Sequence, residues 1–413
     1  MNWRLILSSI SNEIQIEKYF YKINNFKPSD YNYLPRIVKL KDKKYIDLVK
    51  SISFFIRLSW PFVLAPIYYF VSFLASCCRF VLCWDGESVK KLKSECDSVF
   101  SASGEGSFIK ARKFIKPKKT IILGEFSESF KNQNSGFNFV SIYQVIKFYD
   151  LIHIFVISIY YNFKLLVDPS TSRWVMQGYT IFEILLRYKA LYRIEKNIII
   201  VDHFDRWAVL TDEVVSELKN EKKLEIKLTI IQHGILTNDY SNFDSNLPFN
   251  LTTRLNNVTD LIVYDELSKR IFLEKILSND RCCFSISPPV LNMECTESEN
   301  IKLLFVGHSI CLKFHVDVYL FLRHVHPEID FYYKPHPLQT IDHLTLNLGW
   351  KVYDKPDCFP DVDVVVSYPS TLAYEYHLTG KLVIQHNIYD NAVTNSSIIN
   401  QISKELKKRA TSC

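Results

Sequence analysis

Short apolar runs that end in a polar turn, each followed by a helical pattern, recur along most of this chain. The clearest runs are 98–101, 120–123, 197–201, 228–231, 261–264, 301–307 and 362–366. Continuous apolar runs of this length are typical of parallel strands that are buried on both faces. Strands that alternate with helices form βαβ units. The alternation therefore predicts an α/β fold built on parallel sheets.

The chain has 413 residues, which is enough for two or three domains. Two stretches carry the alternation, and a segment of prolines and acidic residues around 287–300 separates them. The expected organisation is an N-terminal extension (1–97), a first Rossmann-like domain (98–290), a second Rossmann-like domain (301–386) and a C-terminal tail (387–413). The extension is predicted to be mostly helical and apolar.

One stretch of the extension is apolar enough to touch a lipid bilayer. Leu58 to Cys78 contains no charged residue, and its length of about twenty residues is close to that needed for a crossing. Arg57 and Arg79 flank it, and two prolines lie inside it. Three interpretations stay open: a buried or amphipathic helical hairpin, an anchor in the plane of the membrane, and a true span.

Charge and cysteine usage exclude several other classes. The net charge of +6 suits an anionic substrate or a membrane surface. No compact block of Lys and Arg with interleaved aromatics appears, so a nucleic-acid partner is not expected. The ten cysteines include no CxxC pair, which makes a zinc site improbable, and no cleavable signal peptide is recognisable. We expect a cytoplasmic protein with free thiols.

Two turns in the second domain carry residues suited to anion binding. Lys334-Pro335-His336-Pro337 follows one strand, and the turn 367–371, with Ser367, Ser370 and Thr371, follows another. Ligands of open parallel sheets bind outside the carboxyl ends of the strands. The run 371–378 is a predicted helix, and the unpaired N–H groups of a helix N-terminus bind phosphate. The two turns therefore predict one anion site.

Two further features of the second domain could belong to this site. Gly307-His308-Ser309 follows the first strand of the domain, where glycine lets the backbone approach a nucleotide closely. A plain strand-to-helix turn explains the same residues. Glu375, on the predicted helix 371–378, either accepts ribose hydroxyls or lies on a solvated helix face.

The first domain has a denser polar cluster at its predicted strand ends. Folding needs at most one of these acids as a helix cap, so the cluster predicts a functional site. A third acidic turn, with Glu125, follows the strand 120–123. The cluster consists of Asp202, His203, Asp205 and Arg206 after one strand and of Gln232 and His233 after the next.

The turn Lys-x-His-Pro, followed some thirty residues later by a Ser/Thr turn and a helix, resembles the HP and Ser/Thr motifs of bacterial GT-B glycosyltransferases. The pattern is similar to that of transferases using CMP-Kdo or CMP-sialic acid, and to that of CDP-glycerol polymerases. The resemblance covers roughly the C-terminal third of the chain. It implies two Rossmann-like domains with a cleft between them. It also implies that His336, Ser370 and Thr371 contact the donor phosphate, with Lys334 and Pro337 in support.

The resemblance also suggests catalytic roles in the first domain. Inverting sialyltransferases often carry an acidic pair before a glycine, where this chain has Gln232-His233-Gly234. In retaining Kdo transferases an Asp is the nucleophile and a Glu the acid/base. The teichoic-type enzymes use a histidine. The residues that match these roles are Asp202 or Asp205 as nucleophile or base, Glu125 as acid/base, His233 or His203 as the histidine, and His203, Arg206 and Gln232 as acceptor contacts.

These observations predict a glycosyltransferase that transfers Kdo or sialic acid from a CMP donor to a surface polysaccharide or lipid-linked glycan. It would work at the inner face of the cytoplasmic membrane, without a cofactor. No metal is demanded, because Asp361-Val362-Asp363 lies at the start of a predicted strand and is interpreted as structural. A CDP-polyol phosphotransferase and a non-catalytic protein on the same scaffold are the alternatives.

Overall fold

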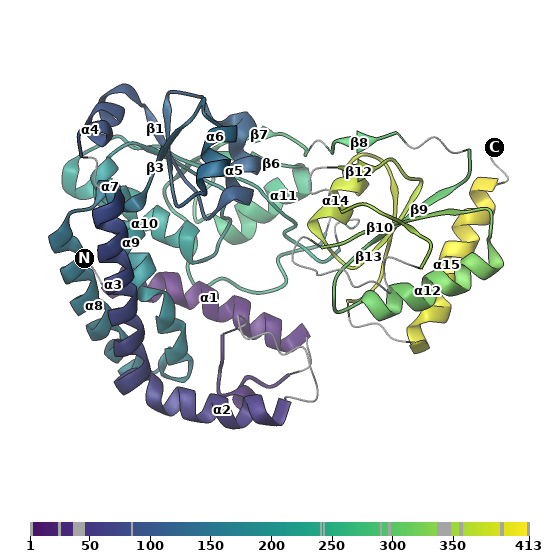
Figure 1. The fold of residues 1–413 in the computed structure, drawn as a ribbon, viewed down its shortest axis with the longest axis horizontal. Coiled ribbons are helices and arrows are strands. Elements are labelled where there is room, and N and C mark those ends of the chain that lie inside the picture. The colour runs from purple at the N-terminus through teal and green to yellow at the C-terminus, as the bar shows by residue number, and fades with distance from the viewer. Residues whose placement is uncertain are drawn as a thin grey trace. The chain divides into compact units, whose positions relative to one another are not determined.

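A computed structural model gives the fold of the chain (Figure 1). It describes residues 3–23, 26–35, 46–83, 86–239, 242, 244–289, 291–295, 299–336, 348–354, 358–388 and 392–410. The chain divides into two compact units. The first consists of Met1–His233 and Leu247–Ile286, and the second of Gly234–Asn246 and Ser287–Cys413.

The first unit is organised around a sheet of seven parallel strands in the order β3-β2-β1-β4-β5-β6-β7. The part of this order from β3 to β6 is that of a doubly wound dinucleotide-binding sheet, which reverses direction between β1 and β4. The strands are β1 (Ser98–Ser101), β2 (Thr120–Leu123), β3 (Asn138–Val140), β4 (Asn197–Ile200), β5 (Leu228–Ile231), β6 (Val258–Val263) and β7 (Cys283–Ile286). The edge strand β7 ends directly before the segment 287–300 that the sequence predicts to separate the two domains.

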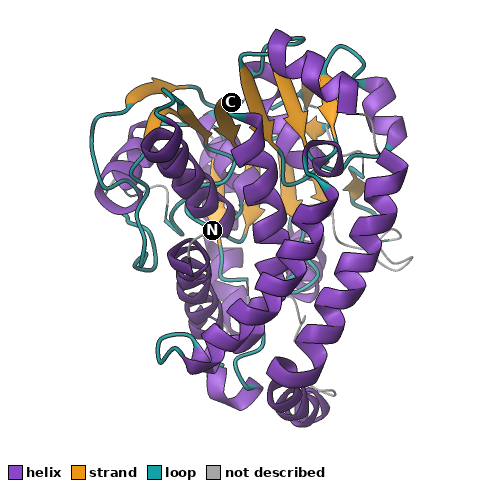
Figure 2. Ribbon diagram, turned by 90° about the vertical axis from the view of Figure 1, so that its left-hand side faces the viewer, coloured by secondary structure: helices purple, strands orange, loops and turns teal. Residues whose placement is uncertain are grey.

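Helices cover this sheet, as the purple ribbons around the orange strands show in Figure 2. The central strands are buried because their apolar side chains meet helices on the sheet faces, whereas the edge strand β7 is largely exposed. One core cluster joins Phe100, Ile122, Val201 and Ile231 to Phe108 of α5. The elements are α5 (Glu105–Ala111), η4 (Arg112–Phe114), α6 (Glu128–Gln133), α7 (Ile142–Val145), α8 (Phe148–Val167), η5 (Ser172–Thr180), α9 (Ile181–Ile194), α10 (Arg206–Lys222), α11 (Glu266–Ile271) and η6 (Phe272–Ile276).

The N-terminal extension is helical, as predicted, and belongs to the first unit. Helix α1 packs against α10, and α3 packs against α8. The buried Asn12 side chain on α1 donates to the carbonyl oxygens of Phe204 and Thr253, which ties this helix to two distant loops. The elements are α1 (Trp3–Ile23), η1 (Pro28–Tyr31), α2 (Ile46–Ser59), η3 (Trp60–Leu64), α3 (Ala65–Cys83) and α4 (Gly86–Glu95).

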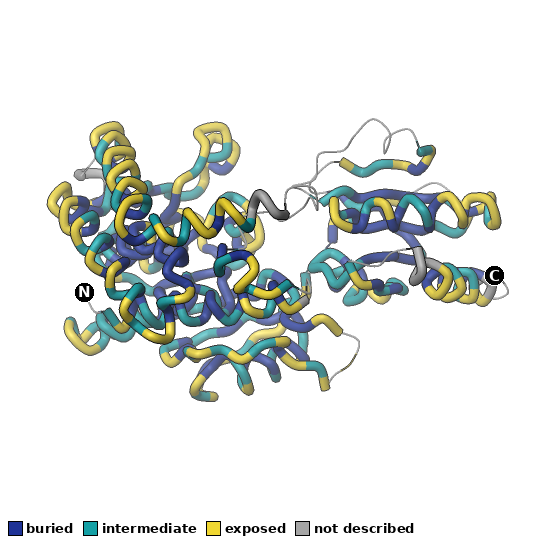
Figure 3. The backbone as a smooth tube through the Cα atoms, turned by 90° about the horizontal axis from the view of Figure 1, so that it is seen from below, coloured by how far each residue is buried: buried dark blue, intermediate teal, exposed yellow. Residues whose placement is uncertain are grey.

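The second unit repeats the architecture on a smaller scale. Its five parallel strands lie in the order β11-β10-β9-β13-β14, so this sheet reverses direction between β9 and β13. In Figure 3 buried residues concentrate in the strands and exposed ones on the outer sides of the helices. The elements are β8 (Met293–Glu294), β9 (Lys302–Val306), α12 (Leu312–Val325), β10 (Asp330–Lys334), β11 (Lys351–Val352), β12 (Phe359–Pro360), β13 (Val364–Ser367), α14 (Thr371–Leu378), β14 (Leu382–Gln385) and α15 (Ala392–Ala410). Strands β8 and β12 pair separately.

The last helix differs from the expectation of a C-terminal tail at 387–413. Ile398, Ile402 and Leu406 of α15 are buried in the core of the second unit. Their spacing of four residues places them on one face of the helix, which packs against α12. The basic residues among them obscured this periodicity in the sequence.

The prediction of an α/β fold with parallel sheets and a helical N-terminal region is confirmed by these two sheets and their helices. Each sheet has the strand order of a Rossmann-like unit. Two such units in one chain are the components of the GT-B fold that the resemblance implies. The cleft between them stays a prediction.

Candidate functional site

The predicted anion-binding turns of the second unit start side by side at the reversal point of its sheet. Val306 at the end of β9 is in register with Lys334 of β10 on one side and with Ser367 of β13 on the other. The three turns that follow these strands therefore leave the same edge of the sheet. Ligands of doubly wound sheets bind at this position.

Three rings gather above this edge. The imidazoles of His308 and His336 have centroids 5.2 Å apart, and the ring of Tyr368 lies 5.4 Å from that of His308. The N–H of Ile310 donates to His308 Nδ1, so the neutral His308 ring carries its proton on Nε2. Tyr368 was not among the predicted site residues, although it lies inside the predicted turn. Its ring adds an aromatic face to two imidazole donors.

The Ser/Thr turn leads into α14 as the sequence predicted. Ser370 caps this helix, because its Oγ accepts from the N–H of Ala373 at 3.2 Å. The hydroxyls of Ser367 and Ser370 are 3.1 Å apart and hydrogen bonded. Thr371 is the first helical residue, and Glu375 is half-buried one turn later. The turn thus places the positive end of a helix dipole and the hydroxyls of Ser370 and Thr371 at the strand edge, whereas Ser367 is fully buried.

Two of the remaining predicted donor residues, Lys334 and Gly307, have packing roles of their own. Lys334 is buried, and its Nζ donates to the carbonyl oxygen of Cys358 at 3.1 Å. Gly307 is required by its neighbour, since a Cβ there would lie 2.2 Å from the Tyr333 hydroxyl oxygen. Ser309 is exposed in the same turn. Pro337 lies outside the described residues.

Behind the Ser/Thr turn lies a buried cluster of Cys311, His315 and His386, whose ligand atoms lie within 4.8 Å of one another. His386 Nδ1 faces the Asn387 carbonyl oxygen at 2.8 Å, which requires a proton on Nδ1. His386 Nε2 then accepts from His315 Nε2, 2.8 Å away, and His315 Nδ1 faces the Cys311 thiol at 4.0 Å. Burial and the second imidazole lower the pKa of His315, and burial raises the pKa of Cys311 to about 12. A neutral chain of hydrogen bonds therefore accounts for these three side chains without an ion.

In the first unit, the predicted acids lie at the reversal point between β1 and β4. Asp202 follows β4 and is only 7% exposed. Burial raises the pKa of Asp202 well above its usual value, the neighbouring Asp205 raises it further, and Arg187 opposes both. A carboxyl in this environment keeps its proton to higher pH than an exposed carboxyl does. Perturbed carboxyls of this kind occur at catalytic sites.

Asp205 has a different environment, although it lies three residues away. Its carboxylate caps α10 by accepting from the N–H groups of Trp207 and Ala208, at 2.8 and 3.1 Å. Burial and Glu13 raise the pKa of Asp205, whereas the two N–H groups lower it. The capping bonds favour a charged Asp205, so the proton shared by the two acids resides mainly on Asp202.

His203 and His233 form a ring pair beside these acids, with centroids 4.2 Å apart. The backbone N–H of His233 donates to His203 Nε2 at 2.9 Å. Burial and Lys110 lower the pKa of His233 to about 4, and a backbone bond to Val201 opposes them only partly. Burial, His233 and Lys110 lower the pKa of His203 as well. Both imidazoles are neutral at neutral pH, and His233 Nδ1 is buried with no hydrogen-bond partner among the described residues.

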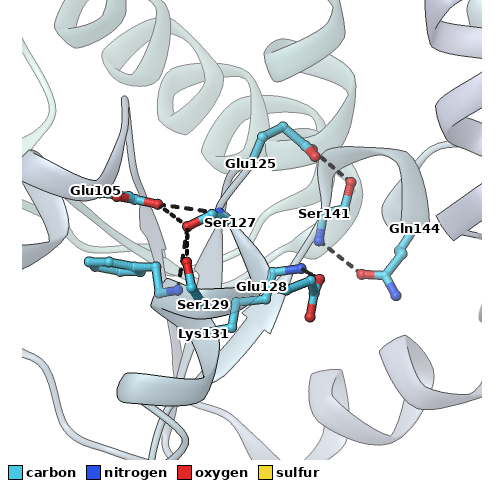
Figure 4. Close-up of polar contacts among 9 residues, drawn as sticks. Glu105, Glu125, Ser127, Glu128, Ser129, Lys131, Ser141 and Gln144 are labelled. Atoms are coloured by element: carbon cyan, nitrogen blue, oxygen red, sulfur yellow. Dashed lines mark hydrogen bonds and ion pairs between the residues drawn. The ribbon is translucent and has the colours of Figure 1, made fainter.

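The other three predicted residues of the first unit are bonded within the fold. Figure 4 shows the Glu125 carboxylate bonded to Ser141 Oγ; it also accepts from the Ile142 N–H at the start of α7. Arg206 forms a buried ion pair with Glu13 of α1 at 3.0 Å. The Gln232 side chain donates to Ser268 Oγ and accepts from the N–H of Tyr264. These contacts supply structural reasons for residues that the sequence suggested for catalysis or acceptor binding, and their functional roles stay predictions.

No family model matches the chain, and no curated protein matches it. Solved structures resemble it at low identity. The GtfA/B complex is 11% identical over 53% of this chain, with a TM-score of 0.33, and the match spans about half (52%) of the length of that chain. Anabaena Alr3699/HepE in complex with UDP-glucose is 11% identical over 75% of this chain and 91% of its own, with a TM-score of 0.37. The wall teichoic acid polymerase TagF is 9% identical over 83% of this chain and 99% of its own, with a TM-score of 0.34.

The fold defines an α/β protein with two Rossmann-like units, each carrying polar side chains at the reversal point of its sheet. In the second unit these are imidazoles, hydroxyls and a helix N-terminus, and in the first unit they are carboxyls and imidazoles. The function proposed below rests on these residues, because none of the TM-scores reaches 0.5.

Proposed function

We propose that the protein is a GT-B glycosyltransferase that transfers an acidic ulosonic sugar, Kdo or sialic acid, from a CMP donor. The acceptor would be a growing surface polysaccharide or a lipid-linked glycan at the inner face of the cytoplasmic membrane. The second unit would hold the nucleotide and the first unit the reacting sugar and acceptor.

The observation that carries this proposal is the convergence at the reversal point of the second sheet. His308, His336 and the N-terminus of α14 offer hydrogen-bond donors of the kind that bind a phosphate. Tyr368 supplies an aromatic face beside them, on which a base or ribose could stack. A site with phosphate donors and an aromatic surface is suited to a nucleotide.

The same groups would assist departure of the nucleotide. In the transfer, the bond between the anomeric carbon and the CMP phosphate oxygen breaks, and its electron pair leaves with CMP. The phosphate therefore gains negative charge in the transition state. Donors that are already in place for that charge lower the barrier. This would be the main catalytic contribution of His336, His308 and the α14 N-terminus.

Asp202 is the favoured acid/base group of the first unit, because Asp205 is occupied as the cap of α10. The acceptor hydroxyl attacks the anomeric carbon and gives up its proton to a base. A raised pKa brings the base closer to neutral pH, where general catalysis is most effective. Direct attack would invert the anomeric centre, and prior attack by a carboxylate would retain it.

A CDP-polyol phosphotransferase is the second candidate, favoured by the His203–His233 pair. Its chemistry needs the same phosphate-binding residues in the second unit, but its base is an imidazole in place of a carboxyl. The two neutral imidazoles beside the strand edge would suit it. In this case His233→Ala would abolish transfer, whereas Asp202→Asn would leave most of it.

Thermal stabilisation of the purified protein by CMP, CDP, UDP and GDP tests the proposal. A ligand that binds only the native state raises the unfolding midpoint as its concentration exceeds its dissociation constant. CMP should give the largest shift. His336→Ala should lose most of that shift, because a hydrogen bond from an imidazole to a charged phosphate contributes about 1.5–3 kcal/mol.

His324→Ala is the matched control, since His324 is an exposed histidine of α12 in the same unit. It should leave the CMP shift unchanged. A shift led by CDP would favour the polyol phosphotransferase, and one led by UDP or GDP would discard the CMP donor. No shift with any nucleotide would support the non-catalytic alternative.

A further inference from the structure

The large exposed hydrophobic side chains of this protein are concentrated on two helical segments of the first unit. One runs through α2, η3 and α3, and the other is α8. By length and composition, Lys50–Cys83 and Phe148–Val167 could each cross a membrane, yet only 22% and 39% of their most apolar windows are buried. Helix α8 therefore has an exposed apolar side.

These two segments lie side by side and run antiparallel. Phe62 is near Phe163, with ring centroids 5.9 Å apart, and at the other end Phe80 is near Phe148, also at 5.9 Å. Phe73 and Phe155 are in contact between these ends, at 5.3 Å. Figure 1 shows α3 and α8 next to each other. We call the exposed hydrophobic side chains of residues 52–82 and 148–167 the apolar face.

The opposite sides of the same helices are fixed to the rest of the first unit. The buried Tyr69 hydroxyl donates to the Gly178 carbonyl oxygen at 2.6 Å, and Ser76 bonds to the Tyr143 hydroxyl. Asp150 of α8 is buried in an ion pair with Arg193 of α9 at 2.7 Å. A helix held in this way cannot be surrounded by lipid without losing these contacts. The apolar face can meet a bilayer only from one side.

The charges within the two segments of the apolar face are mainly basic, and Asp168, half-buried just after Val167, is an acid at its edge. Residues 51–83 contain no Asp or Glu, and the single acid of α8, Asp150, is buried. Arg79 and Lys147 are exposed at the end marked by the Phe80–Phe148 contact, and Lys164 lies at the other end, next to Phe163. Each basic side chain near an anionic membrane surface strengthens binding, and an acidic one would weaken it.

A hollow adjoins the apolar face where α2 meets the end of α8. Its volume is about 240 Å³, and Phe54, Leu58, Phe62 and Leu166 are among the side chains that line it, together with Arg57. An apolar hollow whose lining includes a guanidinium is suited to a lipid, because the acyl chain can fill the hollow and the guanidinium can bind the phosphate of the headgroup. This arrangement favours lipid over a purely apolar protein partner.

We propose that the apolar face is a membrane-docking surface on which α2, α3 and α8 lie in the plane of an anionic phospholipid bilayer, without crossing it. The side chains of the face enter the acyl region, and Arg79, Lys147 and Lys164 meet lipid phosphates. The inference gives the proposed membrane location a specific surface and orientation. It does not depend on the nature of the donor.

Flotation of the full-length protein with preformed vesicles tests this surface. Vesicles of phosphatidylcholine with phosphatidylglycerol should bind the protein, and phosphatidylcholine alone should bind it more weakly. Phe62→Ser/Phe70→Ser/Leu74→Ser, which makes three exposed positions of the face polar, should weaken binding at least ~10-fold because it removes apolar area that would be buried in the bilayer. Arg79→Gln should weaken binding about fivefold, and only to the anionic vesicles.

Leu320→Ser/Phe321→Ser/Val325→Ser is the matched control, since these three side chains are similarly exposed on α12 of the second unit. It should bind as the wild type does. Equal loss in both triple variants would overturn the assignment of the surface. Binding that high salt releases completely would overturn the insertion of the apolar side chains into the acyl region. Concentration-dependent dimers that the first triple variant abolishes, without vesicle binding, would make a second copy the partner. None of these vesicle-binding measurements contains a nucleotide. A failure of the membrane-docking proposal can therefore be distinguished from a failure of the transferase proposal.

Discussion

The two sheets of this protein place polar residues at equivalent reversal points, yet the residues are used differently. In the second unit, His308, His336 and Tyr368 gather with the cap of α14 at one edge of the sheet. In the first unit, most of the predicted polar residues are bonded within the fold. The sequence therefore predicts reliably that a polar residue after a buried strand lies at the edge of the sheet. It predicts much less reliably whether that residue serves a ligand or the fold.

The largest expected effect concerns a residue of the first unit that we predicted to bind the acceptor. Arg206 is 9% exposed and pairs with Glu13, which is 2% exposed. Removing one member of a buried pair leaves the other charge uncompensated and costs about 3–5 kcal/mol. Arg206→Ala and Glu13→Ala should each lower the free energy of unfolding by this amount, measured by denaturant titration.

Arg254→Ala is the control, because no ion pair of Arg254 is found among the described residues. A full loss of activity in Arg206→Ala with unchanged unfolding would contradict the structural role and restore acceptor binding. With such a result, the polar residues at the reversal point of the first unit would serve a ligand, as we propose for those of the second unit.

Local signals in the sequence predict the secondary structure of this protein better than the roles of its polar residues. The strands at 98–101, 120–123 and 228–231 and the helix at 371–378 were predicted at their observed bounds, because apolar runs and breakers are local signals. The sequence also predicted that the two donor turns lie close together, because each turn directly continues a parallel strand of the same sheet.

The roles in the first unit depend instead on partners that are distant in the sequence. Glu13 reaches Arg206 from α1, Ser268 reaches Gln232 from α11, and the start of α7 reaches Glu125. No local pattern shows such contacts. The helix 392–410 was missed for a related reason, since its buried residues become evident only when α12 packs against it.

A smaller effect is expected at Gly307, where the question is whether the glycine serves the nucleotide or the fold. A Cβ at this position would lie 2.2 Å from the hydroxyl oxygen of the fully buried Tyr333. Overpacking of this kind costs about 1–3 kcal/mol. Gly307→Ala should therefore unfold at lower denaturant concentration, even without ligand.

Gly136→Ala is the matched control, since an added Cβ there has open space. It should change the unfolding free energy far less. If Gly307→Ala kept wild-type stability but lost nucleotide binding, the glycine would serve close approach of the donor, as the sequence first suggested.

The smallest effects separate Asp202 from Asp205, the two acids that the sequence could not rank. Asp205→Ala removes a helix cap and should cost about 1 kcal/mol. Asp202→Asn should instead raise the free energy of unfolding at neutral pH. Because burial raises the pKa of Asp202, the native state holds this proton more tightly than the unfolded chain does. The stability that Asp202 contributes is thus present at acidic pH and is lost as pH rises above the unfolded pKa of about 3.9 towards the folded one.

Asparagine keeps the shape of the protonated acid and cannot ionise, so the stability advantage of Asp202→Asn over the wild type should be small near pH 4 and grow with pH. Denaturant titrations across this range measure the difference. The variant should be more stable than the wild type and yet inactive in transfer, since a carboxyl kept in an unfavourable environment is one retained for chemistry. A variant that is stabilised and fully active would assign the first unit's chemistry to the His203–His233 pair instead.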